Sequence, residues 1–339
     1  MDDFGTALLA LFGTRLKEHE PLSKHTNFRV GGPARWFVDI QTEEELVHAV
    51  ELIQVHNVRW FVLGGGSNTL ALDEGFDGIV LCMAMRAFRI EGTSVVAEAG
   101  VISVALARAT AEAGLAGFEW AISLPGTVGG AVRGNAGCFG GEVKDACVSV
   151  RVLRHGQGSS FAEASEDKPM TPPEIVKLTR EDLQFGYRES SIKHSTDIVV
   201  SATFELQRGD VATLKAKLAA ILAKRKATQP LSSGSAGCTF KNYEAVDETE
   251  LQRIGKKLDI LLPGEMMSSR RVSAGWLIDK LGLKGTKIGG AQISSEHGNF
   301  ILNNENATAS DIVQLIALVK TRARNEAGIQ LQEEVQILA

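Results

Sequence analysis

The sequence predicts a fold of mixed helices and strands, layered as α/β or α+β. Helical and strand patterns alternate through the first 150 residues, and near the C-terminus a strong helical pattern is followed by a strand pattern. The chain has 339 residues, which is longer than a single hydrophobic core usually supports. We therefore expect more than one domain.

The first elements are marked by capping residues and short apolar runs. Thr42, with Glu45 three residues later, matches a capping box, and the apolar residues that follow recur at helical spacing. We therefore expect a helix over 42–57. A short apolar strand is predicted over 59–63, and a second helix over 103–113.

The pattern changes near residue 210. A lysine-rich stretch over 211–227 predicts a long helix, which ends at the Gln229-Pro230 pair because proline cannot continue a helix. We expect a domain boundary between residues 206 and 210.

The last two elements are a helix over about 309–326, closed by Gly328, and a strand. Four apolar residues alternate in the strand and are expected on one face: Ile329, Leu331, Val335 and Ile337. Glu334 is then expected to point the other way.

Charge and composition exclude several classes of protein. With a net charge of -5, neither nucleic acid nor an anionic membrane is an expected partner. No apolar run is long enough to span a membrane, and the acidic N-terminus lacks the basic residues of a signal peptide, so we expect a cytoplasmic protein. The scattered cysteines point to reduced thiols, and the scattered histidines predict no metal site.

Two glycine-rich segments are the main functional signal. GGGSN at 64–68 follows a predicted strand, and SLPGTVGGAVRGNAGCFGG places seven glycines between Ser123 and Gly141. Glycines let backbone N–H groups converge on a phosphate, although simple turns are the alternative for either segment alone. Neither segment fits the dinucleotide or P-loop pattern, so a long ligand with a diphosphate, bound in another manner, fits best.

A series of motifs connects the chain to a known family. In order, the chain contains LGGGSN (63–68), SLPGTVGGAVRGNAG (123–137), FGYRES (185–190), GSAGCTFKN (234–242), SAGWLID (273–279), GGAQISSEHGNFILN (289–303) and EEV (333–335). These resemble the successive motifs of UDP-N-acetylenolpyruvoylglucosamine reductases. The resemblance runs from about His25 to the C-terminus, and an ordered set is specific even though each motif alone is weak.

The resemblance implies an α+β fold. It has a two-part FAD-binding unit of the vanillyl-alcohol-oxidase and p-cresol-methylhydroxylase type, and a smaller α+β substrate-binding domain. The implied limits are 1–208 for the FAD-binding domain, split into two subdomains near 90–100, 209–328 for the substrate domain, with an insertion at about 243–272, and 329–339 for the C-terminal strand. The short link after Arg188 resembles the subtype that lacks an extra tyrosine-bearing loop.

The resemblance also implies an activity. Family members bind FAD non-covalently, take reducing equivalents from NADPH and reduce the enolpyruvyl ether of a UDP-sugar to UDP-N-acetylmuramate, a precursor of peptidoglycan. We expect the same cofactor, co-substrate and substrate here, in a monomer.

Three residues are expected to carry the chemistry. Arg188 matches the arginine of the family, and its guanidinium suits a carboxylate or enolate on which charge grows. Cys238 stands where many members have the serine that donates the proton, and a thiol, with a reference pKa of about 8.5, can also donate at pH 7. Glu334 matches the C-terminal glutamate that acts with the arginine on the enol intermediate. From the residues alone, a surface arginine, a buried cysteine and a solvated glutamate stay open.

The motifs further imply binding residues. Those expected to hold FAD are Gly64, Gly65, Gly66, Ser67, Asn68, Ser123, Pro125, Gly126, Thr127, Gly129, Gly130, Asn135, Ala136 and Gly137. Those expected to hold the substrate are Tyr187, Lys226, Lys241, Asn242 and His297, and for His297 a structural role is equally open. The Arg133-Gly134 pair departs from the family, which usually has bulkier apolar residues at this point.

Two other functions stay open. One is an FAD-dependent oxidase of the same flavin fold. The other is a non-catalytic protein that binds nucleotide sugars, which the cysteine at position 238 and the insertion at 243–272 suggest.

Overall fold

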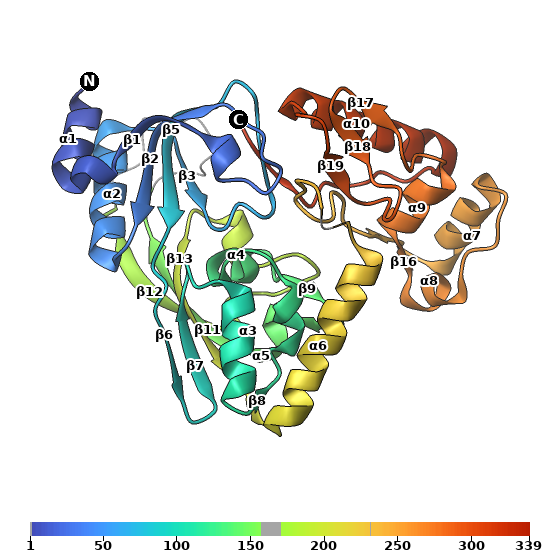
Figure 1. Ribbon diagram of the computed structural model, residues 1–339, viewed down its shortest axis with the longest axis horizontal. Coiled ribbons are helices and arrows are strands. Elements are labelled where there is room, and N and C mark those ends of the chain that lie inside the picture. The colour runs from blue at the N-terminus through green and yellow to red at the C-terminus, as the bar shows by residue number, and fades with distance from the viewer. Residues whose placement is uncertain (1, 157–170, 231) are drawn as a thin grey trace. The chain divides into compact units, whose positions relative to one another are not determined.

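The computed structural model describes residues 2–156, 171–230 and 232–339, which form two compact units (Figure 1). Unit 1 comprises Met1–Glu20, Ala34–Gly65 and Phe76–Arg225, and unit 2 comprises Pro21–Pro33, Gly66–Gly75 and Lys226–Ala339. These limits differ from the expected domains in two ways. Most of the helix after residue 210 groups with unit 1, and two early segments group with the C-terminal part.

Unit 1 begins with a four-stranded sheet in the order β1-β2-β5-β3. Its strands are β1 (Lys17–Pro21), β2 (Pro33–Ile40), β5 (Phe76–Met83) and β3 (Trp60–Leu63), and β2 and β3 run parallel to β5. Helices α1 (Asp3–Phe12) and α2 (Glu43–His56) lie beside it (Figure 1). The Thr42 hydroxyl accepts a hydrogen bond from the Glu45 amide at 3.2 Å and caps α2. The predicted helix over 42–57 and strand over 59–63 are confirmed.

The second sheet of unit 1 has the order β12-β11-β13-β7-β6, and all its pairs are antiparallel. Its strands are β6 (Phe88–Glu91), β7 (Ser94–Glu98), β11 (Cys147–Arg154), β12 (Glu174–Thr179) and β13 (Ile198–Glu205). Helix α3 (Ser103–Glu112) confirms the prediction over 103–113, and the short α4 (Val128–Arg133) packs on β13 and β7. The smaller elements are β8 (Leu115–Ala116), β9 (Gly137–Cys138), β10 (Gly141–Glu142), α5 (Val143–Ala146) and β14 (Gln207–Arg208).

Helix α6 (Val211–Thr228) confirms the long helix predicted over 211–227. Its buried residues, Leu214 and Leu218, belong to the hydrophobic core of unit 1. This burial explains why the compact unit extends to Arg225 rather than ending near residue 208. No helix among the described residues is long and apolar enough to cross a membrane.

Unit 2 has a hydrophobic core of its own, built around a three-stranded antiparallel sheet. The strands are β17 (Lys287–Ile288), β18 (Ala291–Ile293) and β19 (Ile301–Asn303). Helix α10 (Ala309–Arg322) packs on β17 and β18 and continues as a π-helical turn, Ala323–Ala327, which Gly328 ends in a left-handed conformation. The predicted helix over 309–326 is thus confirmed with its cap.

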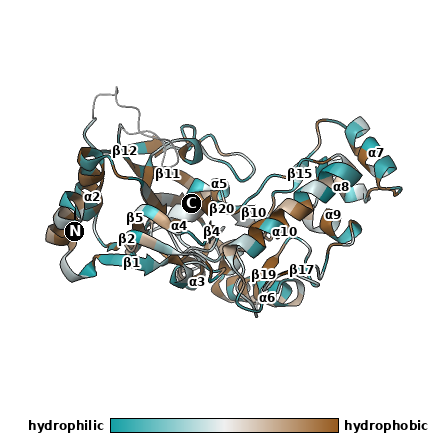
Figure 2. Cartoon of the chain, turned by 90° about the horizontal axis from the view of Figure 1, so that it is seen from above, coloured by the Kyte–Doolittle hydropathy of each residue, from teal (hydrophilic) through white to brown (hydrophobic). Residues whose placement is uncertain are grey.

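The expected insertion at 243–272 folds as a closed excursion. Strand β15 (Tyr243–Glu244) pairs antiparallel with β16 (Arg271–Val272) and joins the two ends of the segment. Between them lie α7 (Glu248–Lys257) and α8 (Gly264–Ser269). Leu251 and Ile254 of α7 are buried in the core of unit 2, and the mixture of teal and brown on α7 in Figure 2 reflects its two faces. The excursion is ordered by its own apolar residues.

The last strand is shorter than predicted. Strand β20 (Gln336–Leu338) pairs parallel with β4 (Thr69–Ala71), and the strand pattern expected from Ile329 onward is not a continuous strand. Ile329, Leu331 and Val335 are buried as expected, but Ile337 is exposed and Leu338 is buried instead. The alternation breaks where pairing with β4 begins, because that register buries Leu338.

Candidate functional site

The two glycine-rich segments meet inside unit 1. A Cβ atom added to Gly64 would lie 2.5 Å from the Thr127 Oγ1, and one added to Gly65 would lie 2.8 Å from the Gly126 Cα. These gaps are too small for any side chain at the two glycines. The structure thus brings parts of the two glycine-rich segments, more than 60 residues apart in the sequence, into close contact, and we call Gly64, Gly65, Gly126 and Thr127 the cradle.

The cradle fits a ligand rich in oxygen atoms. The Thr127 hydroxyl is buried and has no hydrogen-bond partner among the described residues, and the same is true of the Ser103 hydroxyl at the start of α3. A buried hydroxyl without a partner costs free energy, so such a group in a native fold indicates an absent partner. A diphosphate offers acceptors for both hydroxyl donors and nearby backbone amides. The residues present thus fit the diphosphate of FAD.

Ser123 and the glycines of α4 are engaged inside the protein. The Ser123 hydroxyl donates to the Trp120 carbonyl at 3.2 Å and lies 3.1 Å from the Cys138 Sγ, while its carbonyl accepts a hydrogen bond from Arg225. The Gly129 amide donates to the Ala99 carbonyl at 2.9 Å. Gly130 lies in α4, Pro125 and Ala136 lie in the loops before and after this helix, and Gly137 lies in β9; all four stay predicted cofactor contacts.

The GGGSN motif is divided between the units. Gly66, Ser67 and Asn68 belong to unit 2, whereas Gly64 and Gly65 belong to unit 1. Gly66 has a φ of 60°, and a Cβ there would lie 1.9 Å from the His25 carbonyl oxygen, so only glycine fits.

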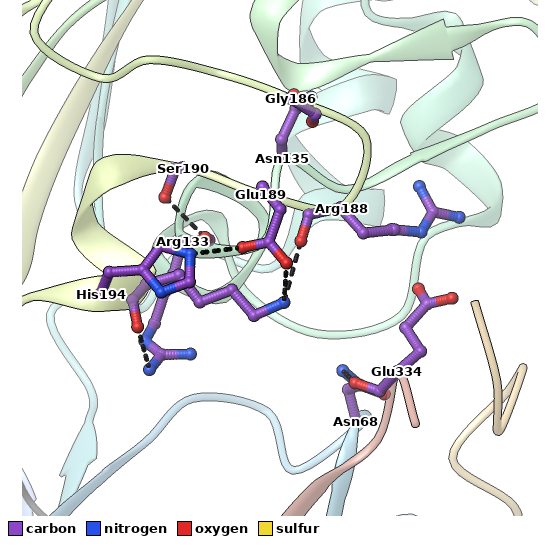
Figure 3. A network of polar contacts seen from close by, with 10 residues as sticks. Asn68, Arg133, Asn135, Gly186, Arg188, Glu189, Ser190, His194 and Glu334 are labelled. Carbon is purple, nitrogen blue, oxygen red and sulfur yellow. Dashed lines mark hydrogen bonds and ion pairs between the residues drawn. The ribbon is translucent and has the colours of Figure 1, made fainter. Parts of the chain in front are cut away.

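Asn68 holds the C-terminal segment of unit 2. Its Nδ2 donates to the Glu334 carbonyl at 3.0 Å (Figure 3). Its own carbonyl accepts from the Gln336 amide at 2.9 Å. A predicted cofactor residue is therefore bonded directly to the backbone of a predicted catalytic residue.

The side chain of Asn135 ties loops of unit 1 together. Asn135 is fully buried, and its Nδ2 donates to the Glu142 Oε2 and to the Gly186 carbonyl, each at 2.7 Å. Its Oδ1 accepts from the Lys144 amide at 3.0 Å. Both amide hydrogens are thus used within the protein, and the Asn135 backbone amide also donates, to the Val132 carbonyl at 3.1 Å, so the contact of Asn135 with FAD stays a prediction.

Arg188 lies in a tight turn of unit 1. The amide of Gly186 donates to the Glu189 carbonyl at 3.0 Å, and the Glu189 amide donates back at 3.3 Å. Within the turn Arg188 has a φ of 58°, the left-handed region that residues with a Cβ rarely adopt. Its guanidinium carbon lies 5.5 Å from the ring centroid of Tyr187, within the range of a cation–π contact. The turn is shown in Figure 3.

The loop of Cys238 in unit 2 is held by backbone pairing. Cys238 forms an isolated bridge with Phe300, and the Thr239 amide donates to the Asn299 carbonyl at 2.8 Å. The side chain of Asn299 adds two bonds, since its Oδ1 accepts from the Phe240 amide at 2.9 Å and its Nδ2 donates to the Phe240 carbonyl at 2.8 Å. Pairing with residues 299–300 therefore fixes the backbone of residue 238 on one side.

Glu334 lies on the other side of the same loop. Its amide donates to the Thr239 carbonyl at 2.8 Å, and Phe240 forms a bridge with Glu333. The structure thus brings two of the three predicted catalytic residues, Cys238 and Glu334, into neighbouring backbone segments of unit 2.

The predicted substrate residues differ in their surroundings. The Asn242 Oδ1 accepts from the Ala274 amide at 3.1 Å, at the start of α9 (Ala274–Lys280), so its side chain supports that helix. The His297 Nδ1 accepts from the Asn299 amide at 3.3 Å, its ring lies 4.8 Å from the Phe300 ring, and burial lowers its pKa. The Lys241 amide donates to the Gln332 carbonyl at 2.9 Å, and Lys226 is exposed on α6.

Three polar residues near the site were not predicted. Lys193 contacts the turn of Arg188, and Asn299 holds the loop of Cys238. Arg225 on α6 donates to the Ser123 carbonyl, its Nε is buried without a partner among the described residues, and burial lowers the pKa of its guanidinium. The basic run Lys224-Arg225-Lys226 and the motif around His297 were the available signals.

Comparison with known proteins gives consistent matches. Residues 229–338 match the family described as UDP-N-acetylenolpyruvoylglucosamine reductase, C-terminal domain, and residues 34–161 match the FAD binding domain family. The reductase of this name from Clostridioides difficile is 34% identical over 325 residues, which cover 95% of this chain and 93% of that protein. The one from Trichlorobacter lovleyi is 37% identical, over 96% of this chain and 94% of that protein.

A solved structure agrees with these matches. The crystal structure of UDP-N-acetylenolpyruvylglucosamine reductase from Thermus caldophilus superposes with a TM-score of 0.72 and 31% identity. The match covers 96% of this chain and all of that one. The likeness therefore extends over both units.

Proposed function

The chain belongs to the family of UDP-N-acetylenolpyruvoylglucosamine reductases, and from this we infer that it reduces UDP-N-acetylglucosamine enolpyruvate to UDP-N-acetylmuramate for peptidoglycan synthesis. It is an FAD-dependent oxidoreductase with NADPH as reductant. Family membership decides against the oxidase and the non-catalytic binding protein. The observation that carries the proposed residue roles is the pairing of the Cys238 loop with the Glu334 segment in unit 2.

We propose that unit 1 holds the diphosphate of FAD between Gly64-Gly65 and the glycine-rich segment at 123–141. The cradle of Gly64, Gly65, Gly126 and Thr127 would take the diphosphate, and the buried Thr127 hydroxyl supplies a donor for it. When bound and reduced by NADPH, FAD supplies the hydride that the methylene carbon of the enolpyruvyl group accepts.

Arg188 stabilises the charge that this addition creates. Hydride addition to the methylene carbon leaves negative charge on the neighbouring carbon and its carboxylate. A guanidinium presents several N–H donors in a planar fork that matches a carboxylate, and its pull grows as the charge develops. The tight turn at 186–189 gives this side chain a defined origin.

Cys238 delivers the proton that completes the reaction. The thiol gives its proton to the carbon beside the carboxylate, which forms the new C–H bond and leaves a thiolate that solvent reprotonates. Glu334, whose backbone is bonded to Thr239, acts on the same intermediate from the adjacent segment. The proposed roles of Cys238 and Glu334 agree with the neighbouring positions of their backbone segments.

The remaining predicted residues serve substrate binding. Lys226 and Lys241 supply positive charge for the diphosphate of the substrate, and Tyr187 lies under Arg188. Asn242 and His297 act by shaping the segments that they support, the start of α9 and the loop at 297–300. The protein acts as a cytoplasmic monomer.

The proposal is tested by following the flavin under anaerobic conditions. NADPH should bleach the FAD absorbance of the purified protein, and UDP-N-acetylglucosamine enolpyruvate should then restore it with formation of UDP-N-acetylmuramate. If the substrate leaves the bleached spectrum unchanged, the proposed reaction is wrong.

A further inference from the structure

The conformation of Arg188 requires support from outside its turn. A φ of 58° places its backbone in the left-handed region, where the Cβ of any residue other than glycine is crowded. Such conformations persist when surrounding contacts determine them, and they cluster at functional sites. The side chain of Arg188 leaves the backbone at this point, so its direction depends on keeping this φ.

Lys193 supplies that support. Its Nζ donates to the carbonyl oxygen of Arg188 at 2.9 Å and to the Glu189 Oε1 at 3.2 Å. The side chain of Lys193 is only 16% exposed, so these contacts are shielded from water. A charged donor on a carbonyl makes a stronger hydrogen bond than a neutral one. The left-handed residue is therefore held through its own carbonyl.

The second anchor of the turn is the glycine-rich loop. The Ser190 hydroxyl donates to the Arg133 carbonyl at 2.6 Å, and Asn135 donates to the Gly186 carbonyl at 2.7 Å (Figure 3). These bonds fix both ends of the turn, whereas the carbonyl of Arg188, between them, is held by Lys193. Removing the lysine would thus remove this bond from the middle of the turn while the bonds at its ends stay in place.

We propose that Lys193 is a positioning residue that keeps Arg188 in its left-handed conformation and so aims the guanidinium at the substrate carboxylate. The inference rests on the proposed role of Arg188. The alternative is that Lys193 serves only as the ion-pair partner of Glu189. It would then stabilise the fold, and its bond to the Arg188 carbonyl would have no role in the reaction. Glu189 also has the ring of His194 at 2.8 Å and the charge of Arg133 nearby, so loss of Lys193 leaves this carboxylate with partners.

The test compares the two half-reactions in the FAD-loaded, full-length protein. Lys193→Met keeps the length of the side chain and removes the donor. We expect it to bind FAD and to be bleached by NADPH at the normal rate, but to be reoxidised by the enolpyruvyl substrate about 10- to 100-fold more slowly, the usual effect of a misplaced group. Lys193→Arg, which retains a charged donor, should recover part of the rate.

The control is Lys287→Met, which breaks an exposed ion pair of similar length to Glu305 in unit 2, 3.0 Å, and should leave both half-reactions unchanged. A Lys193→Met protein that matches this control overturns the proposal. Equal losses in bleaching and reoxidation would also overturn it, because they indicate general damage.

A double-mutant cycle separates this proposal from the function on which it rests. If Lys193 acts through the side chain of Arg188, then Lys193→Met should have no further effect on reoxidation in an Arg188→Ala background, where no guanidinium is left to position. An undiminished effect there contradicts the positioning role. If Arg188→Ala alone leaves reoxidation at the normal rate, the proposed role of Arg188 fails and the positioning role fails with it.

Discussion

The turn at 186–189 in unit 1 and the loop at 234–242 in unit 2 each carry a proposed catalytic residue, but they are held in different ways. The side chains of Lys193 and Asn135 bond to carbonyls of the turn, and the hydroxyl of Ser190, which directly follows the turn, bonds to the Arg133 carbonyl. The loop lies between two backbone segments, with one side chain, Asn299, bridging it. Arg188 is thus held by side chains in addition to the backbone bonds that close its turn, whereas backbone pairing sets the position of Cys238.

This difference explains how a cysteine can occupy position 238. Backbone pairing sets where the Cβ of residue 238 lies, whatever small side chain it bears. A thiol and a hydroxyl both carry a removable proton and differ mainly in size and acidity. We therefore expect the loop to accept either cysteine or serine as the proton donor at position 238, whereas the turn depends on the identity of several side chains.

The largest effect is expected at Arg188 itself. Arg188→Ala removes the group that stabilises the developing carboxylate charge, and we expect reoxidation of the reduced flavin to slow by about 100- to 1000-fold. Bleaching by NADPH should be nearly unchanged, because the arginine acts on the substrate. Stopped-flow absorbance of both half-reactions checks this, and a parallel loss in both would show that Arg188 supports the flavin site instead.

The next effect is expected at the cradle. In Gly65→Ala the new methyl group would lie 2.8 Å from the Gly126 Cα, so the two glycine segments must separate. We expect much of the bound FAD to be lost on purification, measured as the ratio of flavin to protein absorbance. Gly264→Ala, where nothing lies within 4 Å of the added Cβ, is the matched control. Full FAD content in Gly65→Ala would place the cofactor elsewhere.

A smaller effect is expected at Asn299 and should appear in stability. Asn299→Ala leaves the buried amide and carbonyl of Phe240 without their side-chain partners, which should lower the free energy of unfolding by about 2 to 3 kcal/mol. Denaturant titration gives this value. Asn304→Ala, which removes only an exposed bond to Gln292, should change it little. Equal stabilities of the two variants would show that backbone pairing alone holds the loop.

The smallest effect concerns pH. Burial lowers the pKa of His297, so the folded state prefers the neutral ring. As pH falls below the reference value of about 6.5, the unfolded chain takes up the proton first and stability declines. His297→Gln should reduce this decline as the pH falls below about 6.5. His48→Gln, on the exposed face of α2, serves as the control, and identical pH profiles for the two variants would contradict the expectation.

Local patterns predicted the elements well and the long-range contacts poorly. The helices over 42–57, 103–113, 211–227 and 309–326 were found because capping and apolar spacing are local. The final strand was predicted too long, because its pairing with β4, more than 260 residues earlier, decides where it begins.

Local sequence patterns also failed to predict the long-range contacts at the functional site. Motif order placed Arg188, Cys238 and Glu334, but nothing local distinguished Lys193 from a solvated lysine. Its function depends on the left-handed φ of Arg188, which appears only in the folded turn. Asn299 likewise bonds to a residue 59 positions away. The resemblance placed an insertion at about 243–272 without indicating its fold, which depends on two buried residues of α7 and on the pairing of its ends.

The most direct test of whether the loop positions a proton donor is to replace Cys238 with serine and with alanine, and to measure both half-reactions of each variant. If the backbone positions a proton donor at this site, Cys238→Ser should form UDP-N-acetylmuramate at a substantial fraction of the normal rate. Cys238→Ala should lose most of this activity while NADPH still bleaches its FAD at the normal rate. Equal rates of product formation by the Ser and Ala variants would contradict the assignment of residue 238 as the acid.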